Sequence, residues 1–468
     1  MRLNLAKLND RRKKLKKCDD FKFFNYQISL EDPESNPLVL HVAEILQLST
    51  ARDRIHLSTI LANLLLDYSE GGIYSAFTWS TSTIIPRYNG FHLTQNRILK
   101  IARELVRPEH NLVEFHKGQR RGTGQHSKDY RSKIRATTKL LDIARNKYPD
   151  GVPLIEPETI ETIILRDRKV GNSTGKLIDY QDTDAIQRMR NNLARYNKLI
   201  AATEFAIDEG FDFSDNKRPD FTQNRTVRIF NNATFKNGGR FYGGWWVNLS
   251  ENNRQHILIS GEPVVEVDFK NQSLVLLYAR EGIHFGDKQI DGYVLPQYPR
   301  SKATRKIVKM IFTMSLNCES DAQIKSAIKK HLADNNEKYA ELIANDSNFP
   351  MAVLDDFQPV LDSLKEFHPD IARYISEPEI HGPLLQNWDS NIASEVLRLM
   401  TWKKFPILGV HDSFVCRKSD EEHLLAAIQT AYSTFLARMK WDLPSDGALQ
   451  LTSTFQGREK EIVLRIAI

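Results

Sequence analysis

The sequence predicts an α+β protein of several domains, on three observations. Two short apolar strands, at residues 264–267 and 407–410, are each followed closely by an aspartate, and a helical pattern lies between them at 298–318. The first third of the chain instead combines helical patterns with a basic hairpin. The length of 468 residues is about three times that of a typical domain, so two or three domains are expected.

The composition indicates a folded protein without a membrane segment. Hydrophobic residues make up 41% and charged residues 26%, which is the ordinary globular range. No run of about 18 apolar residues is present, and the N-terminus lacks the apolar core of a secretory signal. Cys18, Cys318 and Cys416 form no C-x-x-C pair, so neither a disulfide framework nor a structural zinc site is indicated. We therefore expect a cytoplasmic protein with no membrane partner.

Positive charge is concentrated in two segments. The formal net charge is only +6, but residues 11–17 read RRKKLKK, and residues 111–147 hold ten Lys/Arg against three Asp/Glu. Both segments are candidate phosphate contacts. For the N-terminal arm, residues 1–50, a solvated basic tail is an equally good interpretation.

Residues 51–150 resemble a winged helix. Thr94 is a candidate N-cap for a helix, and residues 112–118 and 129–141 read as two strands around a charged turn, followed by another helix. In a winged helix one helix enters a DNA groove while the wing rests on phosphates. The candidate contacts in this turn and the strand after it are Arg120, Arg121, Lys128 and Arg131. A winged helix used only for packing or protein contact is the alternative.

Residues 151–222 form a connecting segment with a long amphipathic helix that begins at Asp182 or Thr183. Ile186, Leu193 and Ile200 recur at helical spacing, while arginines and lysines occupy other faces. The basic face could grip a nucleic-acid backbone. A solvated basic face explains the pattern equally well.

Residues 223–468 carry the candidate chemistry. A buried strand ends at Asp268, and residues 405–417 read as a hairpin with Asp412 at its turn. The two aspartates are 144 residues apart and meet only if their strands pair in one sheet. Together they would repel one another unless cations bind, and such a pair can hold two Mg²⁺ ions roughly 3.5 to 4 Å apart. Taken singly, each aspartate is more typical of a turn or an N-cap.

A basic helix between the two aspartates adds to this pattern. Residues 298–318 carry the apolar stripe Ile307, Ile311 and Met314, with Arg305 and Lys309 one turn apart. Two cations on one helix face could bind a triphosphate. By itself such a face is more often only solvated.

Together these motifs resemble the family A DNA polymerases and the phage-type single-subunit RNA polymerases. Asp268 in VDFKNQS matches their motif A aspartate, and Asp412 in VHDSF matches the motif C aspartate. Arg305 and Lys309 match motif B, and the order A, B, C agrees. The resemblance covers residues 223 to the end. It implies a right-hand polymerase with an antiparallel-sheet palm and helical fingers, preceded by the winged-helix-like domain and a thumb-like connecting helix.

The resemblance also implies roles for individual residues. Asp268 and Asp412 would ligate two Mg²⁺ ions, or Mn²⁺ in their place, with the carbonyl of Phe269 as a further ligand, and His411 would lie near the product terminus. Nucleotide contacts would come from Arg305 and Lys309, which hold the triphosphate, and from Ser273, Thr313, Asn317 and Phe269. Nucleic-acid contacts would come from Arg240 in GGRFYGGWW, and from Asp389 and Ser390, which open a helix in WDSNIASEVLRLM.

Three departures from the family pattern bear on the sugar of the substrate. Family A DNA polymerases carry a glutamate that excludes the ribose 2′-hydroxyl where this chain has Ser273, and a second motif C glutamate where it has Ser413. Both changes favour ribonucleotides. Asn317 replaces the motif B tyrosine of both branches, so the contact of that tyrosine with the sugar cannot be carried over.

We therefore expect a nucleotidyltransferase, most simply a DNA-dependent RNA polymerase or primase of a phage or mobile element. Its partners would be a DNA template, the nascent RNA or DNA strand and nucleoside triphosphates. A family A-like DNA polymerase is one alternative. A non-catalytic DNA-binding replication initiator with a degenerate polymerase core is another.

Overall fold

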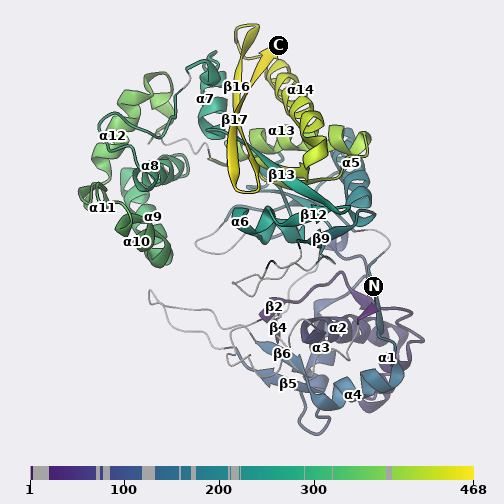
Figure 1. Ribbon diagram of the computed structural model, residues 1–468. Coiled ribbons are helices and arrows are strands. Elements are labelled where there is room, and N and C mark those ends of the chain that lie inside the picture. The colour runs from purple at the N-terminus through teal and green to yellow at the C-terminus, as the bar shows by residue number, and fades with distance from the viewer. Residues whose placement is uncertain are drawn as a thin grey trace. The chain divides into compact units, whose positions relative to one another are not determined.

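Figure 1 shows a computed structural model of the chain, which describes residues 2–3, 21–69, 74–76, 85–118, 132–157, 160–169, 175–208, 211, 221, 223–288, 290–318, 320–375 and 382–467. The chain divides into two compact units, Met1–Glu161 and Thr162–Ile468, each with its own buried apolar core. The basic residues 11–17 lie outside the described residues, and so do the candidate contacts Arg120, Arg121, Lys128 and Arg131.

The first unit combines helices with two small sheets. Its helices are α1 (Pro37–Ile45), α2 (Ala51–Ser69), the 3₁₀ helix η3 (Pro86–Tyr88), α3 (Gln95–Leu105) and α4 (Thr138–Lys147). One sheet has the order β2-β4-β6-β5, from Phe21–Phe23, Tyr74–Ala76, Lys133–Ala136 and Val113–His116. The other has the order β1-β7-β3, from Arg2–Leu3, Val152–Ile155 and Ser29–Leu30.

The elements predicted around the charged turn are confirmed. Thr94 is the N-cap residue of α3, although its side chain makes no capping hydrogen bond. Strands β5 and β6 are antiparallel and flank the turn, and α4 follows β6 with Thr137 as its N-cap. Helix α3 is held by its apolar face, on which Ile98 and Leu105 are fully buried.

The second unit is organised around a seven-stranded antiparallel sheet with the order β14-β15-β13-β12-β9, to which β16 adds by pairing with β13 and β17. Its strands are β9 (Phe205–Ile207), β12 (Ile257–Ile259), β13 (Glu262–Phe269), β14 (Ile407–Val410), β15 (Ser413–Arg417), β16 (Asp446–Phe455) and β17 (Arg458–Ala467). Along β13 the buried side chains Val265, Val267 and Phe269 alternate with Glu266 and Asp268 on the other face.

Long helices pack against one face of this sheet. Helix α13 (Gly382–Trp402) contacts α14 (Glu421–Met439), which follows the short η7 (Lys418–Asp420), and both lie beside β13, β16 and β17 in Figure 1. Helix α5 (Asp184–Ala201) begins after its N-cap Thr183 and packs on α13. Its buried residues Leu193, Tyr196 and Ile200 follow the predicted apolar spacing. The basic side chains of α5 therefore face away from the core.

A small sheet and a group of helices complete the second unit. The small sheet has the order β11-β10-β8, from Gly238–Tyr242, Val227–Phe230 and Ile163–Leu165, and is followed by η4 (Trp245–Asn248) and α6 (Glu251–Arg254). After α7 (Gln272–Arg280) and η5 (Phe285–Lys288) come α8 (Lys302–Ser315), α9 (Asp321–Asp334), α10 (Asn336–Ala344), α11 (Ala352–Asp355), α12 (Gln358–Phe367) and η6 (Pro369–Tyr374). Figure 1 shows α8 to α12, in green, gathered to one side of the sheet.

The predicted mixture of helices with antiparallel sheets is confirmed, and one boundary was wrong. Asp389 and Ser390 lie inside α13 instead of opening it, because the helix begins at Gly382. Leu385, Trp388 and Ile392 are buried at helical spacing, so the apolar stripe extends upstream of the predicted start. Among the described residues, no helix combines the length and the apolar character that a membrane crossing needs.

Candidate active site

The sheet brings Asp268 and Asp412 together. Strands β13 and β15 pair in a register that sets Asp268 opposite Ser413, the residue that follows Asp412. The backbone N–H of Phe269 points to the carbonyl of Asp412 at 3.4 Å. Asp412 lies in the two-residue turn between β14 and β15, where His411 takes the left-handed backbone conformation at φ 60°. Two carboxylates from distant parts of the sequence therefore share one edge of the site.

The turn that holds Asp412 is fixed from outside the sheet. Strand β14 lies at the sheet edge, so its outward carbonyls need other hydrogen-bond donors. The Tyr196 hydroxyl donates to the carbonyl of Ile407 at 2.9 Å, and the indole N–H of Trp246 donates to that of Gly409 at 3.0 Å. Both donors are buried. This anchoring restricts the position of the carboxylate that follows.

The electrostatic environment of Asp268 is unfavourable to its charge. Desolvation by the surrounding protein, and then the negative charge of Asp412, raise the pKa of Asp268 well above its usual range, while Lys309 opposes this shift. The Asp268 side chain is nevertheless exposed, so solvent and ions can reach it even though protein atoms replace much of its hydration shell. Such a pair is expected to gain stability from a bound cation.

A third aspartate, Asp389 on α13, is close enough to Asp412 to be affected by its charge. Asp389 accepts two hydrogen bonds from Arg240 on β11, at 2.8 and 3.1 Å, with side-chain exposures of 5% for Asp389 and 27% for Arg240. Desolvation and the charge of Asp412 raise the pKa of Asp389, whereas Arg240 lowers it. The geometry therefore favours the ion pair, in which Asp389 takes up part of the positive charge of Arg240.

A buried ion pair supports the site from beneath. Arg254 donates to both carboxylate oxygens of Glu266, at 2.6 and 3.0 Å, and the Ser413 hydroxyl donates to Glu266 at 2.6 Å. Glu266 lies two residues before Asp268 on the same face of β13. Ser413, which follows Asp412, is thus tied to a carboxylate on the neighbouring strand.

His411 is half-buried beside the aspartates, with its ring 5.7 Å from that of Tyr242. Its Nδ1 is buried and finds no hydrogen-bond partner among the described residues. Desolvation and then the charge of Arg240 lower the pKa of His411. A neutral imidazole at neutral pH follows, so His411 adds no positive charge to the site.

Helix α8 presents the predicted polar face. Lys309, Thr313 and Asn317 are exposed at steps of four residues. The Thr313 hydroxyl donates to the backbone carbonyl of Lys309, and the Asn317 amide donates to that of Thr313. Arg305, one turn earlier, pairs with Asp291 at 2.6 Å. Lys309 makes no ion pair in the described part of the chain and is the freer of the two cations.

Some of the predicted site residues therefore lie together around Asp268 and Asp412, whereas others do not contact these two aspartates. Electrostatic or hydrogen-bonded contacts connect Asp268, Asp412, Asp389, Arg240, His411 and Lys309. Ser390 donates to the carbonyl of Gly238 and accepts from Arg228, so it supports β11 from a buried position. Ser273, Thr313 and Asn317 make no contact with either catalytic candidate among those the structure describes.

Sequence reasoning missed two buried amides that lie three and four residues after Asp268. Asn271 and Gln272 are 5% and 6% exposed, and none of their side-chain N and O atoms has a hydrogen-bond partner among the described residues. Unpaired buried amides are costly, on the order of 1–3 kcal/mol each, so Asn271 and Gln272 are candidate hydrogen-bonding groups of this site. The polar run KNQS between a strand and an apolar helix was the available sequence signal.

We expect the carboxylate cluster to make metal-free stability fall with rising pH. Because the folded-state pKa of Asp268 is raised, its contribution is fully present below the usual aspartate value of about 4 and is lost as pH rises through the raised pKa. Urea unfolding with a chelator measures the free energy of unfolding at about pH 5 and about pH 8. The decrease in this free energy between the two pH values should be smaller in Asp268→Asn than in the natural protein. Asp334→Asn, at an exposed position on α9, is the control and should leave the loss unchanged. An equal loss in Asp268→Asn and the natural protein would contradict the raised pKa.

The arrangement provides two hard oxygen ligands, a free cation on a neighbouring helix and an ion pair beside them, which suits the handling of phosphate groups. Clusters of three or more metal-binding side chains do not occur in the described residues, so the candidate metal set is the aspartate pair with backbone or water oxygens. No protein-family model matches the chain, and no curated protein matches it.

Proposed function

We propose that the protein is a template-directed nucleotidyltransferase, specifically a DNA-dependent RNA polymerase or primase. The observation that carries the proposal is the pairing of β13 with β15, which sets Asp268 beside the turn of Asp412 with Lys309 close enough to act on the charge of Asp268. Asp268, Lys309 and Asp412 follow one another along the chain in the order of motifs A, B and C in the family that the sequence resembles.

The aspartate pair fits two divalent cations, Mg²⁺ or Mn²⁺. Carboxylate oxygens are the ligands these ions prefer, and the mutual repulsion of Asp268 and Asp412 is what a cation would remove. Asp268 and Asp412 would hold the ions, with the carbonyl of Phe269 as a further ligand. Bound there, the ions would supply charge stabilisation for the attacking and leaving oxygens of a phosphoryl transfer.

The protein's own cations would bind and orient the triphosphate. Lys309 is exposed on α8, and its positive charge acts on Asp268. It would neutralise charge on the leaving pyrophosphate. Arg305 shares its charge with Asp291, so we assign it a weaker, supporting role. Arg240 and Asp389 would together orient the growing strand near Asp412, and His411 would accept or donate a hydrogen bond there as a neutral ring.

The architecture supports the same proposal. The sheet with Asp268 and Asp412 would be the palm, and helices α8 to α12 would be the fingers. In the first unit, α2, β4, α3, β5 and β6 follow one another, and β6 lies between β4 and β5. This is the strand order of a winged helix, which supports a DNA-binding role for that unit.

Product analysis tests the proposal directly. Labelled ribonucleotides and deoxynucleotides are offered on primed and unprimed DNA templates with Mg²⁺. Incorporation of ribonucleotides supports the proposal, and unprimed synthesis identifies a primase or RNA polymerase. Exclusive incorporation of deoxynucleotides would indicate a DNA polymerase instead. DNA binding without any incorporation would leave a non-catalytic initiator.

Ser273→Glu is expected to shift selectivity toward deoxynucleotides by about tenfold or more, equivalent to ~1.4 kcal/mol. Ser273 is half-buried in the first turn of α7, and a longer acidic side chain there would meet a ribose 2′-hydroxyl. The ratio of kcat/KM for ATP and dATP measures the shift. Ser326→Glu, on the exposed face of α9, is the control. An unchanged ratio in Ser273→Glu would show that the residue does not line the sugar site.

A further inference from the structure

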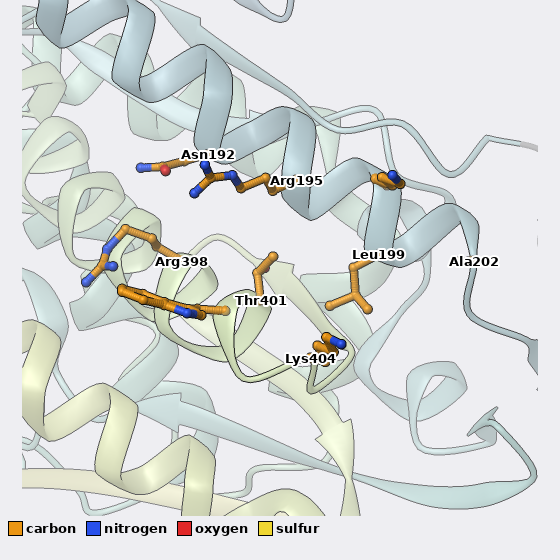
Figure 2. A pocket seen from close by; sticks show the side chains of 9 residues that line it. Asn192, Arg195, Leu199, Ala202, Arg398, Thr401 and Lys404 are labelled. Atoms are coloured by element: carbon orange, nitrogen blue, oxygen red, sulfur yellow. The ribbon is translucent and has the colours of Figure 1, made fainter.

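A pocket far from the aspartate pair lies between α5 and the C-terminal end of α13. Its volume is about 580 Å³, within the range of roughly 300 to 1,000 Å³ that small-molecule sites occupy. In Figure 2 Arg195 and Leu199 come from α5, and Arg398, Thr401 and Lys404 come from the end of α13 and the residues just after it. Thirteen residues of α13 separate Trp402, in this pocket, from Asp389, which corresponds to about 20 Å along the helix.

The lining is positively charged. Arg195, Lys198, Arg398 and Lys404 contribute to it, and none of the described residues that line it is an aspartate or a glutamate. Arg398 is neutralised by Glu395, at 2.5 Å, but the other three cations are exposed and make no ion pair in the described part of the chain. The pocket therefore suits an anion.

The pocket also contains an accessible aromatic ring. Trp402 is 78% exposed, the largest such value among the exposed large hydrophobic side chains of the described residues. The Arg398 guanidinium lies 5.9 Å from the centre of the Trp402 ring, and its bond to Glu395 keeps it there. A single exposed tryptophan needs no explanation. Here, however, the tryptophan contacts an arginine and lies in a pocket with three unpaired cations, and this combination calls for an explanation.

We propose that this pocket binds a nucleotide unit of a single-stranded nucleic acid, with the base stacked on Trp402 and phosphates at Arg195, Lys198 and Lys404. Stacking on an aromatic side chain next to cations that follow the backbone is how single strands are held without sequence preference. The charge and the ring together favour this ligand over an apolar peptide, which would leave the three cations without partners. The site is remote from Asp268 and Asp412, so its occupancy does not depend on the proposed catalytic function.

The proposal is tested by measuring the affinity for a fluorescently labelled oligothymidylate of about 12 nucleotides. Fluorescence anisotropy reports the binding, and a chelator is present throughout. Trp402→Ala should weaken binding about tenfold, while Trp402→Phe, which keeps an aromatic ring, should weaken it much less. Met351→Ala, at a hydrophobic position that is 59% exposed, is the matched control and should have no effect.

Salt dependence tests the phosphate contacts separately. Lys198→Ala and Arg195→Ala should each reduce the slope of log affinity against log salt by about 0.7, the value for one contact to a single strand. Lys329→Ala, at an exposed position on α9, should leave the slope unchanged. Thymidine monophosphate, followed by tryptophan emission in the natural protein and in Trp402→Phe, shows whether a free nucleotide also binds.

Two results would overturn the proposal. In the first, Trp402→Ala and Lys198→Ala bind the oligonucleotide as the control variants do. In the second, Trp402→Ala abolishes self-association in sedimentation while nucleotide and oligonucleotide binding stay unchanged, which would make the pocket a protein contact. Because Trp402 is mostly exposed, its truncation should leave the unfolding midpoint unaltered, which thermal unfolding checks.

Discussion

Asp412→Asn is expected to lower nucleotide incorporation by at least about a thousandfold, equivalent to ~4 kcal/mol of transition-state stabilisation. The amide keeps the size of the side chain but removes the charge that a divalent cation requires. The backbone contact between Phe269 and Asp412 uses main-chain atoms and should persist, as should the hydrogen bonds that anchor β14. Single-turnover extension of a primed template measures the loss.

A second readout separates loss of metal binding from misfolding. In the natural protein Mg²⁺ should raise the unfolding temperature, because it binds the folded state and relieves the repulsion between Asp268 and Asp412. In Asp412→Asn the temperature without metal should be equal or higher, and Mg²⁺ should no longer raise it. Asp334→Asn should behave as the natural protein in both assays. Full incorporation by Asp412→Asn would show that the metal assignment is wrong.

The aspartate pair could be predicted from sequence because its geometry depends on local signals. A run of valines predicts the strand that ends next to Asp268, and a short apolar hairpin predicts the turn that holds Asp412. Only the pairing of β13 with β15 had to be assumed. The i, i+4 spacing of Arg305 and Lys309 similarly fixed one face of α8. Each of these patterns is encoded within about a dozen residues.

Features that depend on long-range packing could not be predicted. Asp389 was expected near a helix start, yet it lies in the interior of α13 and reaches Arg240 on β11, 149 residues earlier. The burial of Asn271 and Gln272 depends on what packs over α7, which no local pattern encodes. The same holds for the support of Ser413 by Glu266, since it requires the diagonal register of two antiparallel strands.

The ion pair of Arg240 and Asp389 is expected to contribute strongly to stability as long as both partners are present. Arg240→Met should destabilise the second unit by about 3 kcal/mol near pH 8, because it leaves a buried carboxylate beside Asp412 without its counter-charge. Near pH 5 the loss should be smaller, since the pKa of Asp389 is already raised and the carboxyl then takes up a proton. Adding Asp389→Asn should recover at least about half of the loss.

Urea unfolding followed by tryptophan emission measures these changes in the second unit, because five of the six tryptophans follow Thr162. Arg190→Met is the control. Arg190 pairs with Asp182 at 3.0 Å, where the side-chain exposures are 21% and 47%, and such an exposed pair is worth about 1 kcal/mol or less. Arg240→Met could lower the free energy of unfolding by no more than Arg190→Met does at both pH values. In that case Arg240 does not stabilise the buried carboxylate of Asp389. The proposed joint role of Arg240 and Asp389 beside Asp412 would then have to be abandoned.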